Sequence, residues 1–355
     1  MAMMRYLLLA ALLVFLGCKK DPDFGPQQDN PEIRDSLLAP VYSALVLNEG
    51  NFTYNNASLT LVDLDQRSDQ QDFFFRSNQV KLGDVAQSIT VRDTMAWIVV
   101  NYSGLIYQVS LPEVKIVKTL NGFVSPRYLL PVSDTIAWVS DLGAEKIYQL
   151  NLRTGEVSTR TVIEGWIEEM IVVGDRVFAC MVKSHEVIVL NKHSGQVEKR
   201  ISVGNQPQSL VQDYQGKVWV LCDGGWNVNT RKNPRLDRID VDRLQVDFTY
   251  TFPNIEDSPT RLRTDGAAQQ LYFLNRGIYR IDVTNNTPSP ELWLETPGRN
   301  LYGLGVSPDG KTILATDAGS FTAKGSILHI DSSANLLKTY PAGFIPQHVA
   351  FYRSN

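Results

Sequence analysis

The sequence predicts an all-β protein, a seven-bladed β-propeller with four antiparallel strands in each blade. A strand motif led by an aromatic residue recurs along the chain with a nearly constant spacing. The two ends of the chain each supply only part of such a unit. Antiparallel units of about 40 to 45 residues are typical of propeller blades, and closed all-β folds of this length form one domain. The 355 residues therefore indicate one ring rather than two domains.

The second strand of each unit shows the repeat most clearly. From Trp97, the leading residue recurs after steps of 41, 40, 41, 53 and 42 residues. An insertion over 224–234 explains the long step. Turns that contain glycine, such as the one at Gly195, then lead into short fourth strands, as hairpin connections require. Six complete units are visible, at 96–100, 137–140, 177–180, 218–221, 271–274 and 313–316.

The seventh blade has to be shared between the two ends of the chain. The C-terminus supplies one strand over 346–351, whereas the N-terminus supplies strands over 44–48 and 58–63. Pairing these strands closes the ring. Closure removes the open sheet edges that would otherwise recruit other chains.

The N-terminus has the pattern of an export signal. Arg5 precedes an apolar run over 7–16, which is shorter than the roughly 20 residues of a membrane-spanning helix. Residues 15–18 resemble a bacterial lipobox, and the charged stretch over 19–23 resembles the surface-export signal of Bacteroidota lipoproteins. These resemblances imply an exported protein, lipid-anchored in the outer membrane and exposed at the cell surface. The predicted organisation is a signal peptide over 1–17, lipidated Cys18 with a flexible tether over 18–39, and the propeller over 40–355.

Charge and residue content argue against several kinds of chemistry. The net charge of −4, with both signs interspersed, does not favour a nucleic-acid partner. Four scattered histidines lack metal-ligand spacing, and no nucleophile elbow or phosphate-binding loop occurs. We expect no catalytic residue, metal or cofactor. Cys180 and Cys222 are interpreted as buried free thiols, with a disulfide as the alternative.

Loop geometry defines a candidate binding face. When the first strand of a blade lies nearest the axis, the loop before it and the loop between the second and third strands meet on one face. Aromatic and polar residues gather in these loops, and they suit a large, flat, amide-bearing ligand. The predicted ligand-binding residues are Asn48, Phe52, Gln87, Asn101, Tyr102, Arg127, Asp141, Trp166, Glu168, Gln208, Asp223, Trp226, Arg261, Asn275, Tyr302, Asp317, Phe321 and His348.

A second interpretation of these residues is structural. The aromatic residues could cover the core between blades. Asn101, Asp141, Asp223, Asn275 and Asp317 recur at one point of the repeat, where side chains of this type cap turns by bonding to the backbone.

Two family resemblances bear on function. Units such as 204–210 followed by 216–220 resemble the YVTN or YncE-like propeller repeats. A narrower resemblance, to a Bacteroidota family of propeller lipoproteins, is carried by residues 46–52, 82–88, 99–104, 125–128 and 165–168. Some members of that family capture cobalamin at the cell surface and deliver it to a TonB-dependent outer-membrane transporter. The resemblance implies a corrinoid ligand and a transporter of that kind as partner.

The leading hypothesis is a non-catalytic, ligand-binding lipoprotein that contacts the membrane only through its lipid. One alternative is an envelope scaffold whose protein partner covers the aromatic face, as exposed apolar patches often indicate. Another is a propeller lyase or lactonase, which would need a divalent metal near the axis.

Overall fold

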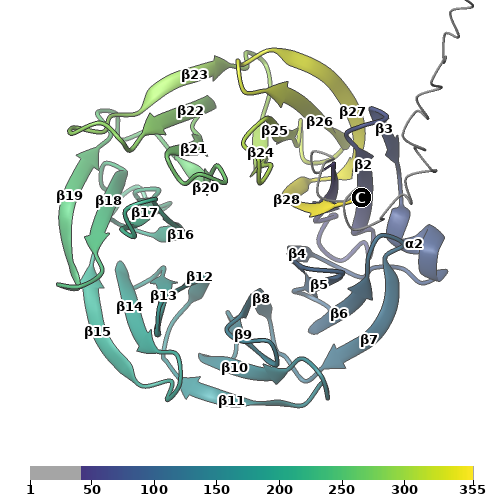
Figure 1. Ribbon diagram of the computed structural model, residues 1–355, viewed down its shortest axis with the longest axis horizontal. Coiled ribbons are helices and arrows are strands. Elements are labelled where there is room, and N and C mark those ends of the chain that lie inside the picture. Colours follow the sequence, from purple (N-terminus) through teal and green to yellow (C-terminus); the bar gives the residue numbers. More distant parts are fainter. Residues whose placement is uncertain (1–40, 355) are drawn as a thin grey trace, which may run out of the picture. The chain divides into compact units, whose positions relative to one another are not determined.

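Seven four-stranded antiparallel sheets surround a central axis, as the sequence predicts (Figure 1). The computed structural model describes residues 41–354. The predicted signal peptide, the lipidation site Cys18 and the tether lie outside the described residues.

Every blade runs from the axis outward in chain order, except for the closing blade. The first complete blade consists of β4 (Ala86–Arg92), β5 (Met95–Val100), β6 (Leu105–Ser110) and β7 (Lys115–Asn121). The second and third complete blades are β8 (Pro126–Pro131), β9 (Ile136–Asp141), β10 (Lys146–Asn151) and β11 (Val157–Val162), then β12 (Ile167–Val173), β13 (Arg176–Met181), β14 (Glu186–Asn191) and β15 (Val197–Ser202). The fourth and fifth are β16 (Pro207–Gln212), β17 (Val218–Cys222), β18 (Arg235–Asp240) and β19 (Gln245–Thr251), then β20 (Thr260–Thr264), β21 (Gln270–Leu274), β22 (Gly277–Asp282) and β23 (Glu291–Glu295). The sixth is β24 (Leu301–Val306), β25 (Thr312–Asp317), β26 (Lys324–Asp331) and β27 (Leu336–Phe344).

The position of a strand within its blade determines its hydrophobic pattern. Second strands such as β5 are buried on both faces and read as continuous apolar runs, whereas outer strands such as β7 alternate between exposed and half-buried residues. In five blades an aromatic residue of the second strand fills the space between neighbouring blades, and Trp138, Phe178 and Trp219 are fully buried. Each such side chain contributes roughly 1.5 to 3 kcal/mol by leaving water. The repeat in the sequence therefore corresponds to the repeated packing of hydrophobic side chains between neighbouring blades.

The closing blade joins the two ends of the described chain. Its sheet order is β28-β1-β2-β3, so β28 (Pro346–Arg353) is the strand nearest the axis, followed by β1 (Tyr42–Asn48), β2 (Ser58–Asp63) and β3 (Ser68–Gln70). The antiparallel pairing of β28 with β1 runs from Tyr42↔Arg353 to Asn48↔Pro346. This arrangement confirms the predicted sharing of the seventh blade.

A short helix lies between the closing blade and β4, and the repeat pattern did not predict it. Helix α2 (Phe73–Asn78) anchors its buried Phe74 against Tyr107, with the ring centroids 4.9 Å apart. Within residues 41–354, no helix is long and apolar enough to cross a membrane.

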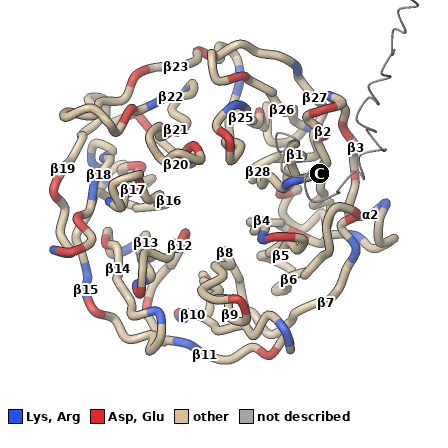
Figure 2. Tube along the Cα trace, in the orientation of Figure 1, with Lys and Arg blue, Asp and Glu red and all other residues tan. Residues whose placement is uncertain are grey.

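Charged side chains of both signs are spread around the whole ring. Figure 2 shows lysines and arginines interspersed with acidic residues along inner and outer strands. No sector of the described chain carries one sign alone in this view.

Removing β28 should open the ring. Truncation after Ile345 exposes the inner edge of β1 and uncovers apolar side chains such as Val46 and Leu314. We expect aggregation by size-exclusion chromatography and a melting temperature lower by more than about 10 °C. A matched truncation after Arg353, which leaves β28 intact, should behave like the full chain. A monomeric protein with an unchanged melting temperature after the longer truncation would refute closure by β28.

Candidate functional site

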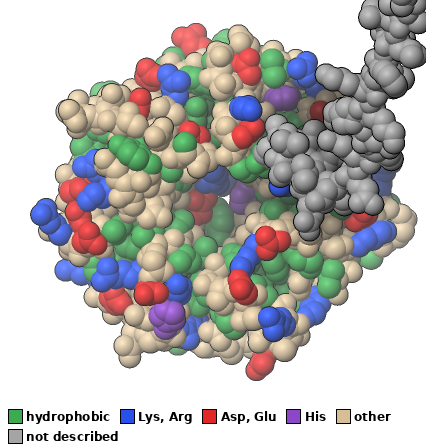
Figure 3. Space-filling model, viewed as in Figure 1, with side chains coloured by type: hydrophobic (Ala, Val, Ile, Leu, Met, Phe, Trp, Pro, Cys, Tyr) green, Lys and Arg blue, Asp and Glu red, His purple; other side chains and the backbone are tan. Residues whose placement is uncertain are grey.

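A cavity of about 710 Å³ lies at the axis of the ring. Figure 3 shows the centre of the molecule hollowed, with charged and hydrophobic side chains around the hollow. Backbone hydrogen bonds join the two kinds of loop that the sequence analysis assigned to one face: the amide of Leu142 donates to Ser125, and that of Val182 donates to Trp166. The loops therefore meet as predicted.

A β-bulge at the start of every innermost strand aims a side chain at this cavity. Gln87, for example, falls between the pairs Ala86↔Val100 and Ser88↔Val99 and has no partner across the sheet. A bulge leaves a residue unpaired and changes the direction of its side chain. The same irregularity occurs in all seven blades. The bulged residues that line the cavity, which we call the axial ring, are Gln87, Arg127, Glu168, Gln208, Arg261, Tyr302 and Gln347.

One side of the axial ring is a closed ion pair. Arg127 contacts Glu168 Oε1 through Nε at 2.9 Å and Nη2 at 2.7 Å, and its Nη1 donates to Gln87 Oε1 at 2.6 Å. The indole N–H of Trp166 donates to the same Glu168 oxygen. The side chains of Arg127 and Glu168 are only 16% and 6% exposed, so their attraction is weakly screened by water.

Two tryptophans form an aromatic platform beside this ion pair. The rings of Trp166 and Trp226 lie 5.3 Å apart at 33°, and the Arg127 guanidinium lies 5.8 Å from the Trp166 ring. Trp226 belongs to the loop inserted between β17 and β18 and is 59% exposed. The two indoles are tilted, with Trp166 half-buried, and the exposed Trp226 ring offers a stacking surface for a flat ligand.

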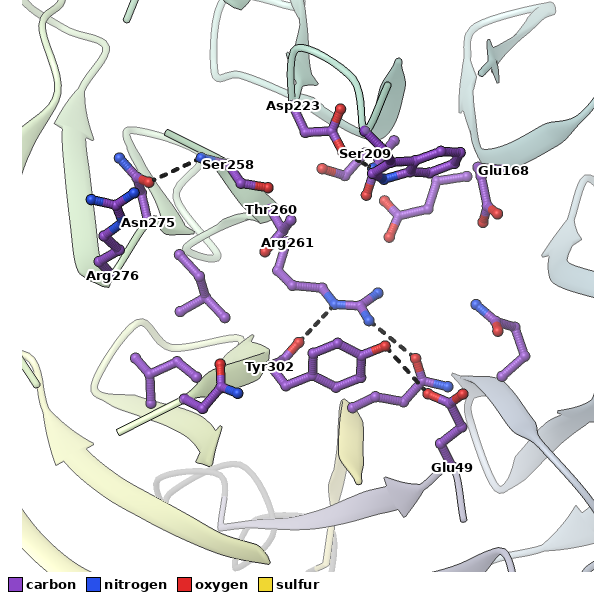
Figure 4. Close-up of a pocket in the computed structure, with 18 of the residues that line it drawn as sticks. Glu49, Glu168, Ser209, Asp223, Ser258, Thr260, Arg261, Asn275, Arg276 and Tyr302 are labelled. Atoms are coloured by element: carbon purple, nitrogen blue, oxygen red, sulfur yellow. Dashed lines mark hydrogen bonds between the residues drawn. The ribbon is translucent and has the colours of Figure 1, made fainter. Parts of the chain in front are cut away.

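The opposite side of the axial ring centres on Arg261. Its Nε donates to the Tyr302 carbonyl at 2.9 Å and its Nη2 donates to Gln347 Oε1 at 3.0 Å (Figure 4). The Tyr302 hydroxyl donates to Glu49 Oε2 at 3.4 Å. Burial raises the pKa of the Glu49 carboxyl, although the nearby Arg261 and Arg127 oppose this.

Asp223 is a buried acid three residues before Trp226. Gln208 donates to its Oδ2, and the amide of Gly225 donates to its Oδ1 at 2.9 Å. Burial raises the pKa of Asp223 to about 6, against the opposing effect of the Gly225 hydrogen bond. A carboxyl in this range can change its protonation near neutral pH.

The cavity brings together many of the side chains that the loop geometry predicts. Those that line it are Gln87, Arg127, Trp166, Glu168, Gln208, Asp223, Trp226, Arg261, Asn275 and Tyr302.

Four predicted polar residues do not line the cavity, and three of them stabilise loops. Asn101 donates to Ser125 Oγ and to the Pro126 carbonyl. The Asp141 carboxylate accepts from four backbone amides, at Val124, Ser125, Gly143 and Ala144. Asn48 donates to Ser58 and Thr60, and Asp317 accepts from the amides of Asn300 and Gly319. For Asn101, Asp141 and Asp317 the capping interpretation describes the structure, whereas Asn48 bonds to side chains of strand β2.

Three predicted aromatic residues lie outside the cavity lining. Phe52 and Tyr102 form an edge-to-face pair 4.5 Å apart and are 60% and 57% exposed. Phe321 packs edge-to-face on Tyr302 at 5.2 Å, so it supports a ring of the site from behind.

His348 occupies the position after the axial ring residue of its blade. It does not line the cavity, whereas Gln347 does. Its Nδ1 accepts from the Ile89 amide at 3.2 Å. Burial, followed by Arg263 and Arg261, lowers the pKa of His348 well below its usual value, so the ring is neutral and can accept this bond.

Sequence reasoning missed Glu49, Glu169 and Gln347. A signal for Gln347 was present, because the axial ring residue directly follows a proline at Pro126, Pro207 and Pro346. Glu49 lies in the loop between β1 and β2, a second-to-third loop of the predicted binding face, from which the sequence pattern selects Asn48 and Phe52 instead.

Within residues 41–354, no group of three or more histidine, cysteine or acidic side chains is placed to hold a metal ion. Cys180 and Cys222 are free and buried.

The fold and the axial cavity define a seven-bladed β-propeller with a polar, aromatic-walled pocket. The chain belongs to the family described as a domain of unknown function (DUF5074), which matches residues 42–343. No curated protein shows significant similarity to the chain.

Solved propellers with low sequence identity share this fold. A quinonprotein alcohol dehydrogenase-like protein from Bacteroides thetaiotaomicron is 12% identical, with a TM-score of 0.68 over 86% of this chain and 77% of that chain. A candidate 6-phosphogluconolactonase from Bacteroides fragilis is 14% identical, with a TM-score of 0.65 over 88% and 98%. A similar protein from Bacteroides uniformis is 13% identical, with a TM-score of 0.67 over 88% and 100%. Similarity at this level shows the fold alone.

Removing the charge of one partner of the Arg127–Glu168 pair should destabilise the folded protein. The Glu168→Gln variant leaves a buried cation without its counter-charge, so the free energy of unfolding should fall by about 3 kcal/mol in urea titrations. The matched variant Glu291→Gln breaks the more exposed Arg280–Glu291 pair and should cost less than about 1 kcal/mol. Equal losses in the two variants would contradict the buried-pair interpretation.

Asp223 should make stability depend on pH. Its folded-state pKa of about 6 exceeds the usual 3.8, so the folded protein holds this proton more tightly than the unfolded chain does. The stabilisation is complete below about pH 4 and is lost as pH rises through about 6, a change of about 3 kcal/mol. The Asp223→Asn variant should lack this loss when urea unfolding is compared at pH 4 and pH 7. Parallel pH profiles for the variant and the wild type would refute the assignment.

Proposed function

We propose that this protein is a non-catalytic ligand-binding propeller and that its ligand enters the axial cavity. The observation that carries the proposal is the axial ring, in which every blade contributes a bulged side chain to one pocket. The propeller fold requires only that the blades pack and the ring closes. A β-bulge that recurs in every blade and directs polar side chains into a cavity therefore favours a binding role.

The chemistry of the cavity supports a flat ligand with polar edges. Trp166 and Trp226 offer a stacking surface. The amide nitrogen of Gln87 can donate and the amide oxygen of Gln208 can accept a hydrogen bond, because Arg127 and Asp223 bond to the other amide atom of each. The volume of about 710 Å³ falls within the range of roughly 300 to 1,000 Å³ that is usual for small-molecule sites. A corrinoid, which is flat and carries amide groups around its edge, fits this description.

The most specific form of the proposal is capture of cobalamin or a related corrinoid for a TonB-dependent outer-membrane transporter. It rests on the resemblance of segments such as 46–52 and 165–168 to surface propeller lipoproteins. In this proposal a lipid at Cys18 holds the protein at the outer membrane, and the propeller itself needs no membrane-binding surface.

An exposed apolar rim favours a second candidate function, as an envelope scaffold. Phe52, Tyr54, Tyr102 and Val124 are all more than half exposed. These four residues come from loops on the face that the axial cavity opens to. A protein partner could cover them, and such a scaffold would bind no small molecule at the axis.

Titration calorimetry of the purified protein with cyanocobalamin and with cobinamide tests the proposal. We expect tight binding of at least one corrinoid, and a loss of tenfold or more, about 1.4 kcal/mol, in Trp166→Ala or Trp226→Ala. Tyr214→Ala is the matched control, because Tyr214 is exposed in the loop between β16 and β17, away from the cavity.

No heat with either corrinoid at high micromolar concentration would reject corrinoid capture. Binding that all three variants retain unchanged would place the ligand somewhere other than the tryptophan platform.

A further inference from the structure

Among the arginines at the axial cavity, Arg261 differs in the groups that its guanidinium bonds to. Arg127 is neutralised by Glu168, and Arg263 meets both oxygens of Glu169, at 3.1 and 3.3 Å. Arg261, by contrast, forms no ion pair with any carboxylate in residues 41–354. Its cationic charge therefore lacks a direct counter-charge in the described chain.

The free part of this guanidinium faces the cavity. The Tyr302 carbonyl and the Gln347 amide oxygen, both neutral, take the Nε and Nη2 groups. Nη1 has no hydrogen-bond partner among the described residues, and Figure 4 shows the guanidinium of Arg261 projecting between the labelled side chains of the cavity. Arginine stays protonated in proteins, so unsatisfied N–H groups of a cation point into the pocket.

Neighbouring acids do not remove this charge. Glu169 is already held by Arg263. Glu49 accepts from the Tyr302 hydroxyl at 3.4 Å and forms no ion pair with Arg261, which bonds to the Tyr302 carbonyl instead. A cation in a partly desolvated site is stabilised most by an anion that also accepts its hydrogen bonds.

The backbone at Arg261 is held in an uncommon conformation. Its φ is 62°, in the left-handed region, which costs a non-glycine residue about 1 to 3 kcal/mol. In the blades of Gln87, Gln208 and Gln347, the positive φ falls two residues earlier, at Val85, Gln206 and Ile345. The chain therefore carries strain at the very residue whose side chain enters the cavity.

We propose that Arg261 binds an oxyanion of the ligand, a carboxylate or a phosphate ester, through its Nη1 edge. The planar guanidinium matches the two oxygens of such a group, and the tryptophan platform then stacks on the flat part of the same molecule. This inference rests on the proposed ligand-binding function and adds that the ligand is anionic at the end that meets Arg261.

The test measures anion binding by the purified full chain in detergent. Melting temperature is followed against increasing inorganic phosphate and, separately, acetate at constant ionic strength, which gives an apparent affinity. We expect saturable stabilisation by at least one anion and a weakening of tenfold or more in Arg261→Gln. Arg238→Gln, the control, removes an arginine that pairs with Asp247 outside the cavity and should bind as the wild type does.

A second variant distinguishes the loss of the Arg261 charge from a general disruption of the cavity. Glu49→Gln removes a negative charge close to Arg261, so it should strengthen anion binding severalfold while altering the same pocket. The proposal is overturned if neither anion stabilises the wild type, if Arg261→Gln binds like the wild type, or if Arg261→Gln and Glu49→Gln weaken binding alike.

Acetate binding alone would identify a carboxylate site and phosphate binding alone a phosphate site, and either result supports the proposal. Failure of the corrinoid titration together with anion binding that depends on Arg261 would reject the corrinoid and keep the oxyanion site. Corrinoid binding together with failure of the anion test would reject the oxyanion site alone.

Discussion

The pairing of β28 with β1 is the constraint on which the rest of the structure depends. Blades bury their apolar faces against their neighbours, so a ring of such sheets is stable only when the last blade meets the first. Val349 of β28 packs in one cluster with Val46 of β1 and Leu314 of β25, which links the closing strand to both sides. The same strand carries Gln347 to the axis, so closure of the fold also completes the site.

The β-bulges recur in every blade, but the side chains that they direct into the cavity differ from blade to blade. Each innermost strand interrupts its pairing at the same point, yet the side chains delivered there are amides, arginines, a carboxylate and a tyrosine. Backbone geometry is thus constant from blade to blade while the chemistry varies. This separation explains why solved propellers at 12 to 14% identity can share the fold without indicating a common ligand.

Charges in the channel are distributed unevenly between paired and unpaired groups. Arg127 and Glu168 satisfy one another, as do Arg263 and Glu169, while Arg261 and Asp223 rely on neutral partners. In a site with little water, ion-paired side chains mainly stabilise the positions of the residues that line the cavity. Charged side chains with neutral partners can still form electrostatic interactions with a ligand. The paired side and the Arg261 side of the axial ring therefore have different roles.

The sequence by itself determined the number of blades, the shared closing blade and the face on which the loops meet. These features follow from the hydrophobic period and the turn residues, which are local properties of the chain. Only the tertiary structure decided which side chains reach the axis. The pattern favoured His348 where Gln347 lines the cavity. It also grouped Asn48 and Asp141 with residues of the site, although Asn48 bonds to strand β2 and Asp141 stabilises loops. The physical reason is that a bulge is defined by pairing with the neighbouring strand, and a shift of one residue turns a side chain to the other face of the sheet.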